Sequence, residues 1–297
     1  MARKYGMPYQ GSKGRIAEWV ADVLPRSHTL VDLFAGGCAV THAALLSGKW
    51  ERIIANDKTD SAVVFCAAIN GEFDGYAACP SREEWKAYRE MDTALALLHS
   101  FGNDKTTYLW GDGLEAVKRP ASLMVSAPSL WERYKWYHRF IDALADYLET
   151  DGNGRLTELE GVERLVQVER VTKLQELRGL QGLSCLQGDY RLVEIPKGAT
   201  VYADPPYRGT DNRGHEVRGK FDFEAFDMWL GGVDFPVYVS EYNAPEGCVE
   251  IARTNRVTTM AANSTGARTE RIFVQERFAD QYQPDQLTLF TGEVVEQ

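Results

Sequence analysis

Short apolar runs gather near the two ends of this chain, and a long region of different character separates them. Residues 28–34 (HTLVDLF) and 52–55 (RIIA) are short and rich in β-branched side chains, which is typical of buried parallel strands. Gly36-Gly37 ends the first run, and residues 39–46 (AVTHAALL) have helical character. This order of strand, helix and strand predicts a βαβ unit and therefore an α/β fold with a doubly wound sheet.

The second group of apolar runs lies in the last third of the chain. Residues 199–203 (ATVYA) and 235–240 (FPVYVS) predict two more strands, and residues 223–230 between them predict a helix. Residues 250–252 and 271–275 predict closing strands. We expect these two strands to be antiparallel neighbours, because the link between them is rich in turn residues and short for a crossover helix.

The middle of the chain has the spacing of amphipathic helices. Residues 81–98 and 129–149 are the first candidates, and residues 156–180 resume helical spacing after the break at Asp151–Gly154. In the second candidate the apolar side chains fall close to one stripe: Trp131, Tyr134, Ile141, Leu144 and Leu148.

These patterns predict a discontinuous chain organisation. We expect one α/β domain formed by residues 1–75 and 183–280, interrupted by a mostly helical insertion over residues 76–182. An insertion of this size is typical of a segment that carries partner or substrate specificity, although a purely structural cap is the alternative. Residues 281–297 are polar and acidic, which indicates a flexible tail.

Composition narrows the class of protein. The chain has 297 residues, of which 44% are hydrophobic, and this excludes a wholly disordered or fibrous chain. No apolar run approaches the roughly 20 residues of a membrane helix, and no apolar stretch follows the basic N-terminus as in a secretory signal. The scattered cysteines form no CxxC pair, which indicates reduced thiols in a cytoplasmic protein and no zinc site. They are Cys38, Cys66, Cys79, Cys185 and Cys248.

The net charge of −10 hides an uneven distribution. Residues 118–139 carry five basic side chains and one acidic one, whereas residues 140–163 carry seven acidic side chains and one arginine. Ordinary solvated faces would produce the same pattern. The alternative is a basic surface facing DNA on an otherwise acidic body.

The strongest chemical signal is Asp204-Pro205-Pro206-Tyr207, directly after a predicted strand. Two successive prolines hold a rigid, extended turn, because each proline fixes its own φ and restricts the residue before it. The turn presents a carboxylate, a proline carbonyl and an aromatic ring at one point. That point is the carboxyl end of a parallel strand, where ligands of such sheets bind.

A second signal follows the first predicted strand. The glycines of Asp32–Gly37 (DLFAGG) allow a ligand to approach the backbone closely, and Asp57 ends the next strand. An acidic residue at about this distance from a glycine turn binds ribose hydroxyls in dinucleotide sites. The full GxGxxG pattern for a pyrophosphate is missing. A ligand with one ribose and no phosphate, S-adenosylmethionine, fits the pattern better.

With these motifs in order, the chain resembles the Dam-type N6-adenine DNA methyltransferases, and most closely the phage-encoded DNA adenine methylases. Pro8–Lys13 (PYQGSK) resembles the N-terminal cofactor motif of that family, and Phe34–Gly37 (FAGG) resembles its glycine loop. Asn56-Asp57, Gly188-Asp189 and the DPPY turn at Asp204–Tyr207 follow in the order of the family. The resemblance implies a Rossmann-like methyltransferase sheet that uses S-adenosylmethionine, with an inserted helical target-recognition domain.

The resemblance also implies roles for individual residues around the cofactor. Tyr9 and Lys13 would contact its methionine part. Phe34 and Gly36 would line it, Asp57 would hold its ribose, and Asp189 would bind its adenine amine.

At the DPPY turn the resemblance implies catalysis by hydrogen bonding. The Asp204 carboxylate and the Pro205 carbonyl would accept the two N–H groups of an adenine amine, with Pro206 keeping the turn rigid and Tyr207 stacking on the base. The base must leave double-stranded DNA to reach this turn, so base flipping is implied. A direct methyl transfer needs no metal and no covalent enzyme intermediate.

Contacts to DNA are expected from basic side chains. Lys135 and Arg139 in the insertion, and Arg208 directly after the DPPY turn, are the candidates. Cytosine-N4 methylation uses the same amine chemistry and is the nearest alternative activity. A catalytically silent DNA-binding protein is another alternative, and both an orphan and a restriction-linked enzyme fit the sequence.

The acidic tail contains one further motif. Gln286, Leu287, Leu289 and Phe290 lie in the run QLTLF, which resembles the peptide by which bacterial replication and repair proteins bind the sliding clamp. A polar tail of this kind has no core of its own in which to bury apolar side chains, which would make them exposed anchors. The alternative is a tail that folds back onto the surface of the enzyme itself.

Overall fold

A computed structural model describes most of the chain: residues 5–7, 13–70, 79–101, 105–150, 177, 181–208, 221–258 and 266–282. It divides into two compact units. The first comprises residues 1–5, 13–62 and 181–297, and the second comprises residues 6–12 and 63–180. Most of the helix predicted over 156–180 lies outside the described residues, as does the QLTLF run.

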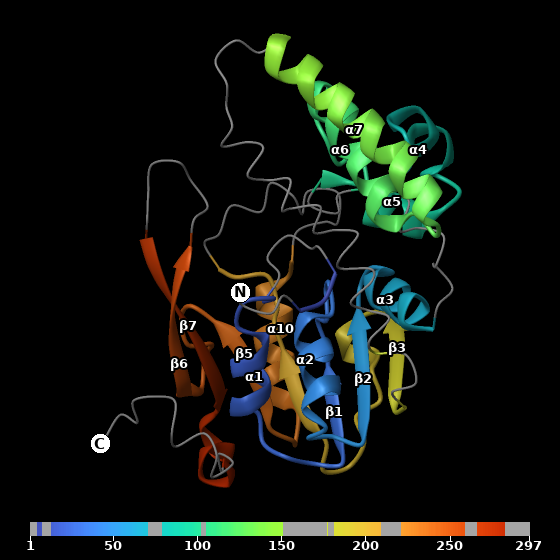
Figure 1. Cartoon of the computed structure of the whole chain (residues 1–297). Coiled ribbons are helices and arrows are strands. Elements are labelled where there is room, and N and C mark those ends of the chain that lie inside the picture. The colour runs from blue at the N-terminus through green and yellow to red at the C-terminus, as the bar shows by residue number, and fades with distance from the viewer. Residues whose placement is uncertain are drawn as a thin grey trace. The chain divides into compact units, whose positions relative to one another are not determined.

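The first unit is built on a seven-stranded sheet with the order β3-β2-β1-β4-β5-β7-β6 (Figure 1). The first five strands in this order are parallel, whereas β7 is antiparallel to both of its neighbours. The sheet is therefore mixed and mostly parallel, consistent with a methyltransferase fold. The strands are β1 Thr29–Asp32, β2 Arg52–Asp57, β3 Leu183–Gln187, β4 Thr200–Ala203, β5 Val237–Glu241, β6 Cys248–Thr258 and β7 Gly266–Gln275.

Most of these strands were predictable from the apolar runs. The antiparallel pairing of the two closing strands is confirmed, although β6 and β7 are much longer than the predicted 250–252 and 271–275. Strand β3 (Leu183–Gln187) was not predicted. It lies at the edge of the sheet and none of its side chains is fully buried, so it lacks an apolar run.

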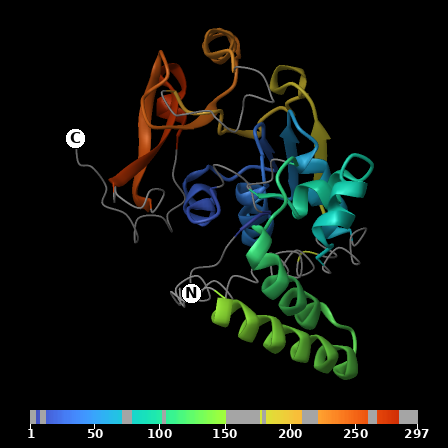
Figure 2. The ribbon, with the colours of Figure 1, turned by 90° about the horizontal axis from the view of Figure 1, so that it is seen from above.

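The sheet is covered on both faces, as its alternating side chains require. Helices α1 (Ala17–Val23) and α2 (Ala39–Ser47) cover one face, and α10 (Phe223–Gly232) covers the other (Figure 2). Neighbouring residues of one strand serve opposite faces. Leu30, Ile53, Tyr202 and Tyr238 pack with α1 and α2, whereas Val31, Ile54, Val201 and Val237 pack with α10.

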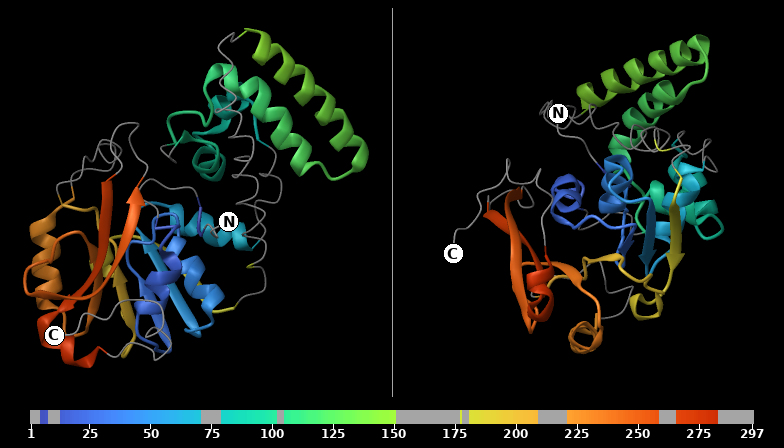
Figure 3. Two further views of the ribbon diagram at one scale, coloured as in Figure 1. Left: turned by 60° about the vertical axis from the view of Figure 1, so that its left-hand side comes forward. Right: turned by 90° about the horizontal axis from the view of Figure 1, so that it is seen from below.

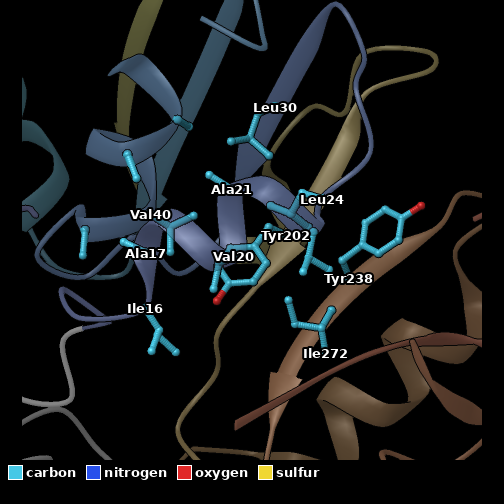
Figure 4. Close-up of a cluster of buried hydrophobic side chains, with 14 of the residues drawn as sticks. Ile16, Ala17, Val20, Ala21, Leu24, Leu30, Val40, Tyr202, Tyr238 and Ile272 are labelled. Atoms are coloured by element: carbon cyan, nitrogen blue, oxygen red, sulfur yellow. The ribbon is translucent and has the colours of Figure 1, made fainter. Parts of the chain in front are cut away.

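Helix α1 anchors the larger core. The buried residues Ala17, Val20 and Ala21 are spaced three and four residues apart, which places them on one face of the helix. This helix was not predicted, because only seven residues form it. In Figure 4 its buried face meets side chains from four strands, namely Leu30, Tyr202, Tyr238 and Ile272.

The strand order reverses direction at the centre of the sheet. From β1 the chain proceeds to β2 and β3 on one side, whereas β4 and β5 lie on the other side. Ligands of open α/β sheets bind at the carboxyl ends of the strands beside such a reversal. The glycine loop follows β1 and the DPPY turn follows β4, so the fold brings both motifs to this position.

Strands β6 and β7 form a long two-stranded ribbon at one edge of the sheet (Figure 3). A register shift between Glu250 and Ala252 interrupts their pairing. The buried side chain of Gln275 ties β7 to the rest of the unit: its Oε1 accepts the Val237 N–H at 2.9 Å, and its Nε2 donates to the Leu230 carbonyl at 3.1 Å.

The second unit is helical in its described part. Helices α4 (Arg82–Tyr88) and α5 (Thr93–Leu98) replace the single helix predicted over 81–98, so that prediction was wrong in its continuity. The break has a local cause, because the Asp92 carboxylate accepts the Leu95 N–H at 2.9 Å and so starts a new helix. Helix α3 (Ser61–Ile69) joins the two units along the chain.

A pair of helices follows in the same unit. Helix α7 (Leu130–Thr150) confirms the helix predicted over 129–149 and packs against α6 (Asp112–Ser126), which was not predicted. The aromatic members of the predicted stripe on α7 are exposed, Trp131 by 75% and Tyr134 by 56%. The aromatic spacing on this helix therefore indicated an exposed surface and not a core.

Two features bear on the class of protein. No helix in the described part of the chain is long and apolar enough to cross a membrane. All five cysteines are free thiols.

Asp32, the last residue of β1, is a buried acid inside the sheet. Its Oδ2 accepts a hydrogen bond from the Thr41 hydroxyl of α2 at 2.8 Å, which joins strand and helix. Burial raises the pKa of Asp32 to about 7, although the hydrogen bond from Thr41 acts in the opposite direction. Repulsion by Asp204 and Asp57 adds to the effect of burial.

We expect Asp32→Asn to weaken the pH dependence of stability between about pH 4 and pH 7. The folded chain holds the Asp32 proton up to about pH 7, whereas an unfolded chain releases it near its ordinary pKa of 3.8. Stability from this group is therefore complete below the lower value and is lost as pH rises, by up to about 1.4 kcal/mol per pH unit. Urea unfolding of both proteins at several pH values measures the difference, and equal pH slopes would contradict the expectation.

Candidate functional site

The DPPY turn places a buried carboxylate at the end of β4. Asp204 follows Ala203 directly, and its Oδ1 lies 2.8 Å from the Lys13 Nζ. The side chains of Lys13 and Asp204 are 7% and 16% exposed. Because the pair is screened from water, its mutual attraction is much stronger than that of a surface ion pair.

Lys13 also contacts the aromatic member of the turn. Its ammonium lies over the Tyr207 ring, 4.3 Å from the centroid. The resemblance implies that Lys13 contacts the methionine part of a cofactor. In the structure Lys13 contacts Asp204 and Tyr207. The ammonium lies above the ring and beside the carboxylate. The amine of a base stacked on Tyr207 would need this same position. A base amine that reaches Asp204 must share or displace the ammonium.

The protonation of Asp204 is set by opposing influences. Burial raises its pKa above the ordinary value, and the Glu270 carboxylate raises it further by repulsion. The Lys13 ammonium acts in the opposite direction, as does a hydrogen bond from Tyr207. A carboxylate with a raised pKa is a stronger hydrogen-bond and proton acceptor.

Tyr207 is buried and held at several points. Its hydroxyl donates a hydrogen bond to Glu270 Oε2 on β7 at 2.8 Å. The Tyr242 ring meets the Tyr207 ring edge to face, with centroids 4.4 Å apart. Burial raises the pKa of Tyr207 well above its ordinary value, so the phenol keeps its proton at neutral pH.

A second buried acid, Glu241 at the end of β5, fixes the backbone after the turn. Its Oε2 accepts the Arg208 N–H at 3.2 Å, and its Oε1 accepts the Tyr242 N–H at 2.8 Å. Burial raises the pKa of Glu241. The Arg208 side chain, a candidate for DNA contact, forms an ion pair with Asp227 of α10 at 2.6 Å.

The glycine loop after β1 has a backbone that few residues adopt. Gly36 and Cys38 have φ values of 50° and 58°, in the left-handed region. The loop is fastened to β2, since the Gly36 N–H donates to Asp57 Oδ2 at 2.9 Å. The other oxygen of Asp57 accepts the N–H and the hydroxyl of Thr59, at 2.8 and 2.6 Å. Asp57 therefore shapes the loop that the sequence predicts for the cofactor.

Asn56 joins three strand ends at this edge of the sheet. Its Nδ2 donates to the Leu33 carbonyl after β1 at 3.0 Å and to the Gly188 carbonyl after β3 at 3.1 Å. The Gly188 N–H in turn donates to the Asp57 carbonyl at 2.9 Å. The three loops predicted to hold the cofactor are thus fixed to one another by hydrogen bonds.

Asp189 begins a short 3₁₀ helix at Tyr190–Leu192. Its carboxylate accepts the Arg191 backbone N–H at 2.9 Å and forms an ion pair with the Arg191 guanidinium at 2.6 Å. The hydrogen bond from that side chain lowers the pKa of Asp189 to about 2. The neighbouring Tyr190 ring packs on Phe34, with centroids 4.9 Å apart, so the glycine loop and the Asp189 turn are adjacent.

The chemistry of this edge suits a cationic ligand. Burial is the main cause of the raised pKa of Asp32, and repulsion by Asp204 and Asp57 adds to it. A positive charge placed among these carboxylates relieves that repulsion, which fits the sulfonium of S-adenosylmethionine. The described residues contain no group of three or more His, Cys, Asp or Glu side chains that could hold a metal ion.

The remaining predicted site residues lie elsewhere or outside the described part of the chain. Lys135 and Arg139 are exposed on α7 in the second unit, with their charged groups over the Trp136 ring at 5.9 and 5.0 Å. Tyr9 lies outside the described residues. Pro205 and Pro206 form the turn itself.

Two acids of the site were not predicted from the sequence. Glu241 ends a strand that was predicted, but nothing in the sequence indicates that its carboxylate turns back to the DPPY backbone. Glu270 lies in a stretch with five arginines, and there it resembles a counter-charge of a basic surface. Only the pairing of β5 with β7 brings it to Tyr207.

Comparison with known proteins agrees with this geometry. Residues 9–108 match the family model described as D12 class N6 adenine-specific DNA methyltransferase. A search of curated proteins finds no match. The matched segment contains the glycine loop and Asp57, and the DPPY turn lies beyond it, at the end of the strand that pairs with β1. Over this segment the chain is therefore similar to the D12 class N6 adenine-specific DNA methyltransferases.

Proposed function

We propose that this chain transfers the methyl group of S-adenosylmethionine to N6 of an adenine flipped out of double-stranded DNA, and that the DPPY turn performs the reaction. The observation that carries the proposal is the buried Asp204 carboxylate, held with an N–H donor above the Tyr207 ring at the reversal of strand order. A carboxylate and an aromatic face so arranged can bind an amine on a planar base.

The cofactor, when bound, supplies an electrophilic methyl group. We assign its surroundings to Phe34 and Gly36 of the glycine loop, to Asp57 for the ribose and to Asp189 for the adenine amine. Tyr9 and Lys13 complete the proposed set at the methionine end. Repulsion by Asp204 and Asp57 adds to the effect of burial on the pKa of Asp32, and a sulfonium cation at this edge would relieve that repulsion.

The residues of the turn act on the target amine. The lone pair of an aromatic amine is delocalised into the ring, which makes the nitrogen a poor nucleophile. Hydrogen bonds to the Asp204 carboxylate and the Pro205 carbonyl draw the two N–H groups out of the ring plane and restore the lone pair. When the nitrogen gains a methyl group it loses one proton. The raised pKa of Asp204 suits that carboxylate to receive the proton.

The second unit is proposed to bind the DNA. Helix α7 presents Lys135 and Arg139 one turn apart, beside the exposed rings of Trp131 and Tyr134. Basic side chains neutralise phosphates, and exposed aromatic rings can pack on sugars or unstacked bases. This arrangement supports target recognition by the helical segment.

Asp204→Ala is expected to reduce methyl transfer by roughly 100-fold or more, because it removes an acceptor that acts on the amine in the transition state. Binding of S-adenosylmethionine, measured by calorimetry, is expected to stay largely intact. Mass analysis of nucleosides from DNA incubated with enzyme and cofactor measures the transfer. Glu224→Ala, which removes an exposed acid on α10, serves as the matched control.

Two outcomes would contradict this assignment. An Asp204→Ala variant with near-normal turnover would show that the carboxylate is not the acceptor. Methylcytosine in place of N6-methyladenine would favour the cytosine-N4 alternative, whereas DNA binding by the wild type without any methyl transfer would favour a silent DNA-binding protein.

Charge reversal on α7 is expected to weaken DNA binding. In Lys135→Glu and Arg139→Glu the slope of log K against log salt should fall by about 1 for each phosphate that the helix no longer neutralises. Fluorescence anisotropy with a labelled duplex at several salt concentrations measures this slope. Lys197→Glu, in the loop before β4, is the control, and slopes that match the control would place DNA elsewhere.

We also propose that the tail binds the bacterial sliding clamp through Gln286, Leu287, Leu289 and Phe290. A peptide of residues 280–297 is expected to bind the purified clamp with a dissociation constant on the order of micromolar. Leu289→Ala combined with Phe290→Ala should abolish binding and leave methylation of short duplexes unchanged. A wild-type peptide that does not bind, or a double variant inactive on short duplexes, would make the tail part of the enzyme's own fold.

A further inference from the structure

A buried acid holds the hydroxyl of Tyr207, and the proposed methyl transfer gives that acid no role. The Tyr207 hydroxyl donates to Glu270 Oε2 at 2.8 Å, and the Glu270 side chain is 2% exposed. Glu270 lies on β7, which pairs with β5 inside the sheet. A strand of the sheet, and not a surface loop, therefore fixes the position of this carboxylate.

Different contacts hold the Tyr207 side chain at different points. The Lys13 ammonium lies over the ring face, and the Tyr242 ring meets it edge to face. The Glu270 carboxylate acts at the hydroxyl, the point of the side chain farthest from the backbone. A restraint at that point limits swings of the ring about the Cα–Cβ bond, because such swings move the hydroxyl most. A ring on which a planar base stacks must keep its position, because stacking depends on the placement of the two rings.

Glu270 also acts on the second acid of the site. Its charge repels the Asp204 carboxylate and raises the pKa of that group. A buried carboxylate beside another acid destabilises a fold unless hydrogen bonds or cations compensate for it. A buried acid that acts on both Tyr207 and Asp204 is well placed for a role at the site.

The single proton of the Tyr207 hydroxyl suggests that role. The structure shows this hydroxyl 2.8 Å from Glu270 Oε2, and a hydrogen bond from the same hydroxyl lowers the pKa of Asp204. One hydroxyl donates one proton. When Glu270 accepts that proton, the lone pairs of Asp204 are left for N–H donors, such as Lys13 or the amine of a base.

We infer that Glu270 is a positioning residue for adenine methylation, which fixes the Tyr207 ring and draws its hydroxyl proton away from Asp204. The inference rests on the proposed function, because it assigns Tyr207 to the target base and Asp204 to its amine. Glu270 acts through these two residues and does not touch the base.

A double-mutant cycle between Glu270 and Tyr207 tests the inference. Glu270→Ala should lower kcat for methyl transfer by roughly 10- to 100-fold, with little change in KM for S-adenosylmethionine. Glu270→Gln should recover part of this loss, because its amide oxygen still accepts the hydroxyl proton. In the Tyr207→Phe background either Glu270 variant should have little further effect, since the hydrogen bond is already gone.

Gln275→Ala is the matched control on the same strand. Gln275 is also a buried polar residue of β7, but its hydrogen bonds go to Val237 and Leu230 within the sheet. Its variant should lose thermal stability and keep kcat per folded molecule. If Glu270→Ala fails to fold, Glu270→Gln and Tyr207→Phe complete the cycle.

The outcomes separate this inference from the proposed function. A wild type that transfers no methyl group to adenine overturns the proposed function. An active wild type overturns the inference alone under any of three results: full kcat in the Glu270 variants, independent effects in the double variant, or an equal loss of kcat in Gln275→Ala.

Discussion

The buried ion pair between Lys13 and Asp204 is the interaction on which the arrangement of the site depends. Its two residues come from the two separate long segments of the first unit, 13–62 and 181–297, and the sheet brings them within 2.8 Å. Without the ammonium, a carboxylate at this depth would be strongly inclined to protonate, because burial and Glu270 both raise its pKa. Lys13 therefore favours the charged form of Asp204, which accepts hydrogen bonds.

The strand ends around this pair form a connected frame. Asn56 and Asp57 fasten the loops after β1 and β3 to β2, and Glu241 fastens the backbone after β4 to β5. Buried polar networks with satisfied partners hold a single geometry, since any displacement leaves a polar group without its hydrogen bond. The site thus gains its order from side chains that begin or end strands and not from the glycine loop alone.

Much of this fold could be predicted from the sequence, because apolar runs and turn residues report burial along the chain. Strands β1, β2, β4 and β5 and the DPPY turn were found in this way. Edge strand β3 was not predicted, because its half-exposed residues do not form an apolar run. The aromatic spacing of α7 has a related limit: periodicity shows which residues share a face, but not whether that face is buried. The candidate site was likewise predictable in its motifs and not in its contacts. The pairing of Lys13 with Asp204 and of Glu270 with Tyr207 joins residues far apart in sequence, and such pairs depend on strand order, which local patterns leave open.

The place of β1 in the sheet has a consequence for the synthesis of the chain. Strand β1 pairs with β2 on one side and with β4 on the other, and β4 begins only at Thr200. At roughly 5–20 residues per second, a ribosome needs on the order of ten to thirty seconds to pass from the end of β2 to β4. For that interval the nascent β1 exposes a row of unpaired backbone groups, the kind of edge that recruits foreign strands. The central pairing of the sheet, which aligns the glycine loop with the DPPY turn, therefore becomes available only after the second unit has been made.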